Sequence, residues 1–150
     1  MTLREEFEPV GICHNGLAGF RQSRAQCWDQ TVAQEGWEDG LRGEIERATA
    51  FLEQCGRRKT LNRTCTSYGL KHEAERWAAN NGWRERGGYV SNGALLMAAH
   101  RMGFQIKRCG EAWQGSPNAW LNISQDRPGH DQMLRMRVAL WHEARVRRMF

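Results

Sequence analysis

The sequence predicts a mostly helical α+β fold with a winged-helix-like core, and three observations favour it. The segments TSYGLKHEAERWAANNG and YVSNGALLMAAHRMG each place apolar residues at helical spacing and end at a glycine. FQIKRC and NAWLNIS alternate apolar and polar residues on either side of a glycine-containing loop, which indicates a β-hairpin. Two helices followed by a hairpin is the element order of a winged helix-turn-helix, a module that often binds nucleic acid.

The length and composition predict one globular domain. A chain of 150 residues, 40% hydrophobic and 26% charged, is long enough and apolar enough to bury its own core. We expect an irregular and weakly helical N-terminal part over residues 1–40, the winged-helix-like core over 41–124, and a C-terminal helix over 131–149.

The first half of the chain holds one strongly amphipathic helix. Pro9 and several glycines break any period over residues 1–19, and the pattern over 20–34 is only weakly helical. Asp39 is the expected N-cap of the amphipathic helix and Gly56 its expected end. Its apolar face, at spacings of four and three, consists of Leu41, Ile45, Ala48, Leu52 and Cys55. The basic run RRKTLNR, residues 57–63, is expected to be a linker.

The second half supplies the remaining helices. Ser67 is the expected N-cap of one helix, with an inner stripe of Leu70, Ala74 and Trp77. Ser91 or Asn92 caps the next, whose inner stripe is Leu95, Ala98, Ala99 and Met102. The side chains expected to face outward are then Gly93, Met97, His100 and Arg101. The C-terminal helix has a face that packs on the chain's own core or on a second copy: Met133, Met136, Leu140 and Ala144.

Charge is distributed unevenly along the chain. The net charge is −4 over residues 1–50, +7 over 51–110 and +2 over 111–150, and arginine supplies most of the positive charge. Arginine's planar guanidinium suits phosphates and guanine edges better than the lysine ammonium does. The asymmetry predicts an anionic partner for the middle of the chain and a different role for the N-terminal third.

The predicted nucleic-acid surface combines the basic run, the exposed side of the third helix and the hairpin. Four cations in the run can neutralise phosphates, and an indole in the hairpin loop can stack on a base. Its residues are Arg57, Arg58, Lys59, Arg63, Asn92, His100, Arg101, Lys107, Arg108 and Trp113. An ordinary solvated helix face and a solvated charged loop are the alternatives for the same residues.

A protein-binding surface is the rival interpretation. The acidic N-terminal third can form a local negative face, and indoles outside the core can anchor a protein partner. The residues concerned are Glu35, Trp37, Glu38, Asp39, Glu44, Glu46 and Trp83. A pI near 9.3 argues against mimicry of DNA by the whole molecule, although a local acidic face stays possible.

The sequence carries no strong catalytic, metal or membrane signature. Five cysteines at irregular spacing, without a visible signal peptide, favour reduced thiols and a cytoplasmic protein. No paired CxxC spacing indicates a metal, no P-loop or GxGxxG motif indicates a nucleotide cofactor, and none of the histidines lies in HExxH. Cys65 near His72 is a weak candidate for a nucleophile and its base. No apolar run approaches the roughly 18 residues of a membrane span.

Three segments resemble a known group of proteins. RKTLNRTCTSYGLKHEAERW, YVSNGALLMAAHRMGF and GSPNAWLNIS are similar to small proteins carried by proteobacterial phages and mobile elements, over roughly residues 58–124. The resemblance implies a host-cell setting in which such proteins are commonly DNA-binding regulators or inhibitors of host defence, including anti-CRISPR proteins. Two hypotheses follow: a module that binds DNA or RNA, and an anti-defence inhibitor that binds a host nucleoprotein complex.

Overall fold

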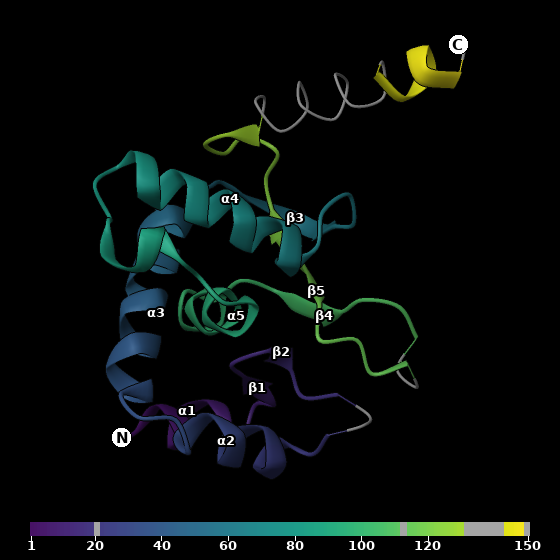
Figure 1. The fold of residues 1–150 in the computed structure, drawn as a ribbon. Helices are drawn as coiled ribbons and strands as arrows, with labels where there is room; N and C mark the ends of the chain where they lie inside the picture. The colour runs from purple at the N-terminus through teal and green to yellow at the C-terminus, as the bar shows by residue number, and fades with distance from the viewer. Residues whose placement is uncertain (20–21, 112–113, 131–142, 149–150) are drawn as a thin grey trace.

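The computed structural model describes residues 1–19, 22–111, 114–130 and 143–148 (Figure 1). The predicted class, a mostly helical α+β protein, is confirmed. The helices are α1 (Leu3–Phe7), α2 (Arg24–Val32), α3 (Trp37–Glu53), α4 (Ser67–Asn80), the 3₁₀ turn η1 (Glu85–Gly88) and α5 (Asn92–Arg101). The strands are β1 (Ile12–Cys13), β2 (Gly16–Leu17), β3 (Arg57–Asn62), β4 (Ile106–Arg108) and β5 (Ala119–Ile123). None of the helices in the described part of the chain has the length and apolar character needed to cross a bilayer.

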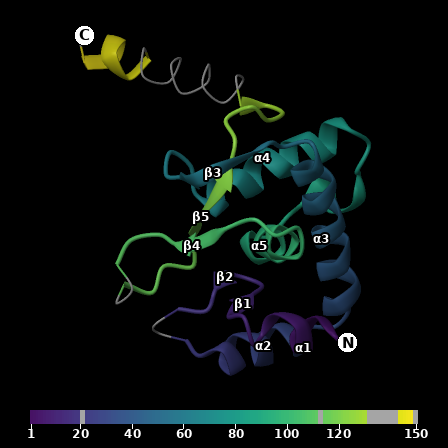
Figure 2. The same ribbon diagram turned by 180° about the vertical axis from the view of Figure 1, so that it is seen from behind.

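Helix α5 is the centre of the molecule. Its residues from Asn92 to Ala99 are all buried, and from Ala94 onwards they have no exposed surface. Figures 1 and 2 show α4 on one side of α5 and the β1–β2 hairpin with α1 and α2 on the other, while α3 and the larger sheet flank it. A helix that is apolar all round needs cover on every side, and its neighbours supply this cover.

The burial of α5 corrects the expected orientation of its side chains. Gly93 and Met97, expected to face outward, have no side toward solvent, and Asn92 is only 7% exposed. The sequence pattern favours a single apolar stripe, but β1 and β2 pack on α5 away from that stripe. His100 and Arg101, in the last turn, are exposed as expected.

Residues 57–62 form an edge strand rather than a linker. Strand β3 pairs antiparallel with β5, which also pairs with β4, so β5 lies in the middle of a three-stranded sheet. The side chains of Ala119, Leu121 and Ile123 are fully buried against the helices, as their alternation predicts. The charged edge strand was not recognised because four of its six residues are exposed, which hides any alternation.

Two expected helix N-caps shift toward the N-terminus, one by three residues and the other by one. Helix α3 begins at Trp37 after Gly36, so Asp39 lies in its first turn rather than at its cap. Helix α4 is capped by Thr66, whose hydroxyl accepts the N–H of Gly69. The hydroxyl of Ser67 is instead buried and accepts the N–H of Ala119, which joins α4 to the central strand β5.

The N-terminal segment is more regular than expected. Thr2 and Glu5 form a reciprocal capping box that begins α1, and Ser23 and Gln26 form another at α2. Cys13 of β1 and Cys27 of α2 form a disulfide, and both are 2% exposed. The expectation of reduced thiols is therefore wrong for this pair, because the fold brings together two cysteines that show no paired spacing in the sequence.

Two glycines let the β1–β2 turn approach the start of α5 and the segment before β5. A Cβ atom on Gly93 would lie 1.9 Å from the carbonyl oxygen of Cys13 and 2.5 Å from that of His14. Gly16 has a φ of +125°, and a Cβ there would lie 2.2 Å from the carbonyl oxygen of Pro117. The N–H of Gly93 donates to the oxygen of His14 over 3.0 Å, so the contact is a backbone hydrogen bond that excludes side chains.

The structure describes only residues 143–148 of the C-terminal helix that is expected over 131–149. Residues 143–148 are helical, with exposed side chains. Met133, Met136 and Leu140 lie outside the described residues, so the homodimer through this helix stays a prediction.

We expect Gly93→Ala to lower the free energy of unfolding by about 2 kcal/mol or more, since the added methyl group forces the hairpin away from α5. Urea denaturation followed by circular dichroism measures this change. Gly69→Ala is the matched control, because a Cβ there is 4.0 Å from its nearest neighbour. The control should be neutral or stabilising by up to about 1 kcal/mol. Equal effects of the two substitutions would contradict the close approach.

We expect loss of the Cys13–Cys27 disulfide to lower the free energy of unfolding by about 2–4 kcal/mol, because the bond closes a loop in the unfolded chain. Thermal denaturation with and without a reductant measures this effect. A Cys13→Ala/Cys27→Ala variant should melt at a lower temperature than the oxidised wild type and should not respond to the reductant. An unchanged melting temperature of the wild-type protein on addition of the reductant would contradict the presence of the disulfide.

Candidate functional site

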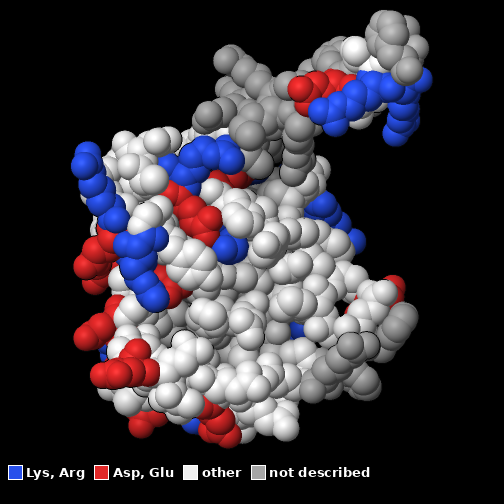
Figure 3. Space-filling view, in the orientation of Figure 1, with Lys and Arg blue, Asp and Glu red and all other residues white. Residues whose placement is uncertain are grey.

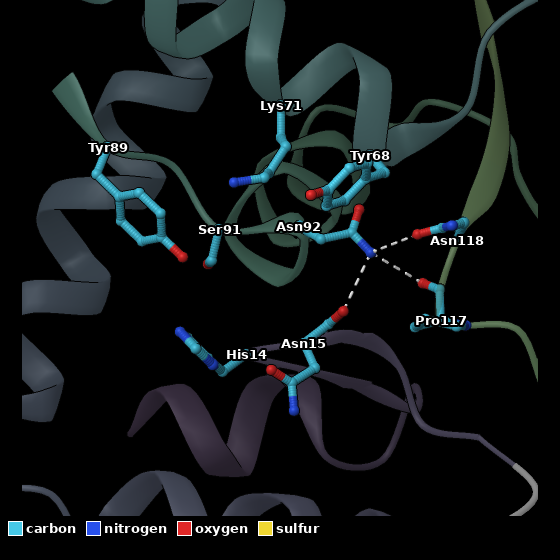
Figure 4. Close-up of a pocket in the computed structure, with 9 residues that line it drawn as sticks. All are labelled: His14, Asn15, Tyr68, Lys71, Tyr89, Ser91, Asn92, Pro117 and Asn118. Carbon is cyan, nitrogen blue, oxygen red and sulfur yellow. Dashed lines mark hydrogen bonds between the residues drawn. The ribbon is translucent and has the colours of Figure 1, made fainter.

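A pocket opens where the N-terminal ends of α4 and α5 meet the β1–β2 turn and the segment before β5 (Figure 4). Its volume is about 450 Å³. Four separate stretches of the chain line it: His14 and Asn15, Tyr68 and Lys71, Tyr89, Ser91 and Asn92, and Pro117 and Asn118. None of these residues is acidic.

The carboxamide of Asn92 holds three of these stretches together. Its Nδ2 lies 3.1 Å from each of three acceptors, the backbone oxygens of Asn15 and Pro117 and the Oδ1 of Asn118. Three acceptors around one atom identify it as the nitrogen. The Oδ1 of Asn92 is buried without a hydrogen-bond partner. In Figure 4 this oxygen points toward Tyr68, one of the residues that line the pocket.

Lys71 places its ammonium group between two tyrosine rings. Its Nζ lies 4.8 Å from the centroid of Tyr89 and 5.5 Å from that of Tyr68, and 2.8 Å from Oε1 of Glu75. Glu75 also contacts His72, whose Nδ1 is 3.0 Å from its Oε2. The side chain of Lys71 is therefore held in one direction although it is a long and flexible one.

A second region of interest is the sheet face turned away from the helices. Lys107 of β4 pairs with Trp120 of β5, so their side chains share this face. The guanidinium of Arg63, just after β3, lies over the Trp120 ring at 4.8 Å. The side-chain amide of Asn122 donates to the carbonyl oxygen of Arg58, which ties the exposed edge strand to this surface. None of the residues of β3, β4 and β5 is acidic.

The structure divides the predicted basic run into two groups. Arg58, Lys59 and Arg63 are exposed and project from β3 or the turn that follows it. The guanidinium of Arg57 donates to the carbonyl oxygen of Met102 and lies over the Phe104 ring at 4.2 Å. Arg57 therefore stabilises the junction of α5 and β4, and the other three cations are the ones available to a ligand.

The predicted residues of α5 are not gathered into one exposed surface. Asn92 is buried at the pocket rather than exposed at the helix N-terminus. Arg101 forms a two-pronged ion pair with Glu6, at 2.8 and 2.7 Å, which lowers the pKa of the Glu6 carboxyl through hydrogen bonding. His100 contacts the Phe7 ring edge-on. Helix α1 thus occupies the polar end of α5 that was expected to meet bases.

The hairpin residues also differ in their availability. Lys107 is exposed. Arg108 is half-buried and donates to the carbonyl oxygens of Ser116 and Ala18, so it joins the hairpin loop to the segment after β2. Trp113 lies outside the described residues.

The predicted protein-binding residues form no continuous acidic surface. Glu35, Asp39 and Glu46 are exposed, and Glu38 pairs with Arg42 at 2.8 Å. Glu44 is 3% exposed and accepts the N–H of Ser91, because the start of α5 packs on α3. Trp37 packs edge-on against the buried Trp28, and Trp83 is half-buried. Figure 3 shows the exposed acids along the α3 edge, while the middle of that face is largely uncharged.

No cluster of three or more potential metal ligands occurs among the described residues. Burial raises the pKa of the Cys55 thiol to about 12, so this cysteine is a poor nucleophile at neutral pH. His72 faces Glu75 and the Tyr68 ring rather than a thiol in the contacts described above.

Most pocket residues were missed at the level of sequence, apart from Asn92. The missed residues are His14, Asn15, Tyr68, Lys71, Tyr89, Ser91, Pro117 and Asn118. Each belongs to a short polar stretch beside a glycine or proline, which resembles ordinary turn chemistry. The segments SYGLKH, YVSNGA and GSPNAW all contribute side chains to this one pocket.

No known protein family matches the chain, and no curated protein or solved structure shows significant similarity to it.

We expect Asn92→Asp to lower the free energy of unfolding by about 3 kcal/mol or more at pH 7, because an oxygen would replace the nitrogen that faces three acceptors. The same surroundings raise the pKa of the introduced carboxyl above its unfolded value. The folded variant therefore binds a proton more readily, and the difference from wild type should shrink as pH falls toward 5. Urea denaturation at both pH values measures the difference, with the exposed Asn80→Asp as control. A pH-independent difference would contradict the assigned amide orientation.

Proposed function

We propose that the chain binds nucleic acid through the outer face of its three-stranded sheet together with the exposed edge strand β3. This surface, called the sheet face, consists of Arg58, Lys59, Arg63, Lys107 and Trp120. The observation that carries the proposal is a half-buried tryptophan flanked by cations on strands without a single acidic residue. Cations neutralise phosphates, and an indole offers a stacking surface to any base.

The residues of this face favour single-stranded over double-stranded nucleic acid as the ligand. In a helix-turn-helix the recognition helix enters the major groove, which requires one exposed helix side. The corresponding helix α5 is covered by β1 and β2, and its last turn contacts α1. A stacking tryptophan on an open sheet instead requires bases that are free to leave the duplex.

We further propose a winged-helix-like unit formed by α3, β3, α4, α5, β4 and β5. The order helix, strand, helix, helix and hairpin supports this assignment, as does the central place of β5 between β3 and β4. The unit differs from a DNA-reading module in that the N-terminal segment covers its third helix. The hairpin and sheet face are then its accessible binding elements.

The second candidate function is an anti-defence inhibitor that binds a host nucleoprotein complex. The supporting observation is the set of acidic side chains along the α3 edge in Figure 3. Asp39 and Glu46 of α3 are exposed, as is Glu35 just before this helix. The resemblance to phage- and mobile-element-borne proteins is compatible with both functions. Salt-dependent binding to naked nucleic acid separates them, since it is a requirement of the first function alone.

We expect Lys59→Ala/Lys107→Ala to weaken binding to a labelled oligothymidylate by about tenfold at moderate salt. The slope of log K against log salt should fall by about 1.4, or about 0.7 for each lost phosphate contact on a single strand. Fluorescence anisotropy over a salt series measures both quantities, with the matching duplex as a second probe.

The charge-matched control is Arg42→Ala/Arg84→Ala, which removes two exposed cations of α3 and the turn before η1. Its affinity and salt slope should equal those of wild type. Absence of salt-dependent binding by the wild-type protein, or equal losses in the two variants, would refute the sheet face as the binding surface.

A further inference from the structure

We propose that the pocket between α4, α5, the β1–β2 turn and the segment before β5 binds a nucleoside monophosphate unit whose base carries an exocyclic amino group. The unit is either a free nucleotide or the end of a strand. This inference does not rest on binding by the sheet face, because none of the residues of that face lines the pocket.

The amide oxygen of Asn92 specifies a hydrogen-bond donor on the ligand. This oxygen is buried and has no partner in the protein, a condition that is rare for native side chains. It cannot exchange places with Nδ2, which three acceptors hold. An amino group on an aromatic base is a donor that reaches such an acceptor in the plane of its ring.

The side of the pocket away from the Asn92 oxygen favours an anionic group on the ligand. In Figure 4 the Lys71 ammonium, the Tyr89 hydroxyl and the His14 ring follow one another along that side. Lys71 uses one of its three donors on Glu75, and an ammonium group has two more. Because no carboxylate lines the pocket, an amine or a free amino acid would leave its own positive charge without a partner.

The tyrosines favour a ligand with a flat aromatic ring near its amino group and its anionic group. Only five large hydrophobic side chains are exposed among the described residues, and two of them are Tyr68 and Tyr89, at 51% and 40%. Exposed aromatic rings at a pocket commonly receive a ligand ring, and tyrosine stacks on any base. A pocket of about 450 Å³ lies in the range that holds small ligands. An amino-bearing ring joined to an anion is the chemistry of AMP or CMP.

Calorimetric titration of the full chain with AMP tests the proposal. We expect saturable binding of one AMP per chain. Purine riboside 5′-monophosphate, which lacks only the amino group, should bind about tenfold more weakly because the Asn92 oxygen then stays unpaired. No saturable AMP binding at millimolar concentrations would overturn the proposal, and equal affinities for the two nucleotides would overturn the role of Asn92.

Two single-residue variants locate the ligand in this pocket. Tyr68→Ala should weaken AMP binding at least about fivefold through loss of stacking. Tyr89→Phe removes one hydroxyl, so it should weaken AMP binding about threefold or more and leave adenosine binding unchanged. Thermal melting at the wild-type temperature verifies the fold of each variant. Wild-type AMP affinity in both folded variants would overturn the site.

The sheet-face variant Lys59→Ala/Lys107→Ala is the control that separates the two proposals. It should bind AMP as wild type does, while Tyr68→Ala should bind oligothymidylate as wild type does. Displacement of a labelled oligoadenylate by AMP identifies a strand end as the natural ligand, and failure to displace it identifies a free nucleotide. Loss of AMP binding in the sheet-face variant would place the nucleotide outside the pocket and overturn the proposal.

Discussion

The side-chain amide of Asn92 connects parts of the chain that are far apart in sequence. Its nitrogen donates to Asn15, 77 residues earlier, and to Pro117 and Asn118, 25 and 26 residues later. Those three contacts set the N-terminal hairpin and the start of β5 against the first turn of α5. The hairpin can come this close only because Gly16 and Gly93 have no Cβ. The pocket is the space that this arrangement leaves open.

The burial of α5 from Asn92 to Ala99 limits which surfaces of the protein can meet a partner. A central helix with buried sides cannot offer its outer face to a groove, so the predicted binding cations that remain available to a partner lie in or just after the strands β3 and β4. Several predicted cations hold the fold together instead, such as Arg57, Arg101 and Arg108. A guanidinium that already donates to a carbonyl oxygen or a carboxylate has fewer donors left for phosphates.

Local signals in the sequence were sufficient for the helices α3, α4 and α5 and for the β4–β5 hairpin. The stripe of Leu41, Ile45, Ala48 and Leu52 is buried as its spacing predicts, and Gly103 follows α5 with a left-handed φ of +79°. Strand β3 was predicted to be a linker because an exposed edge strand rich in cations has the composition of a loop. The Cys13–Cys27 disulfide was not predicted because the spacing of these two cysteines matches no pattern that indicates a pair.

The sequence by itself determined the α+β class, most helix ends and the alternation of β5, because each depends on residues a few positions apart. Only the tertiary structure decided which side of α5 is covered, which arginines are engaged and where the pocket lies. These features depend on contacts between segments as distant as Asn15 and Asn92, and no local period encodes such contacts. The sheet face depends on the sequence and on the tertiary structure. Its basic residues are visible in the sequence, but their position beside Trp120 follows from strand pairing.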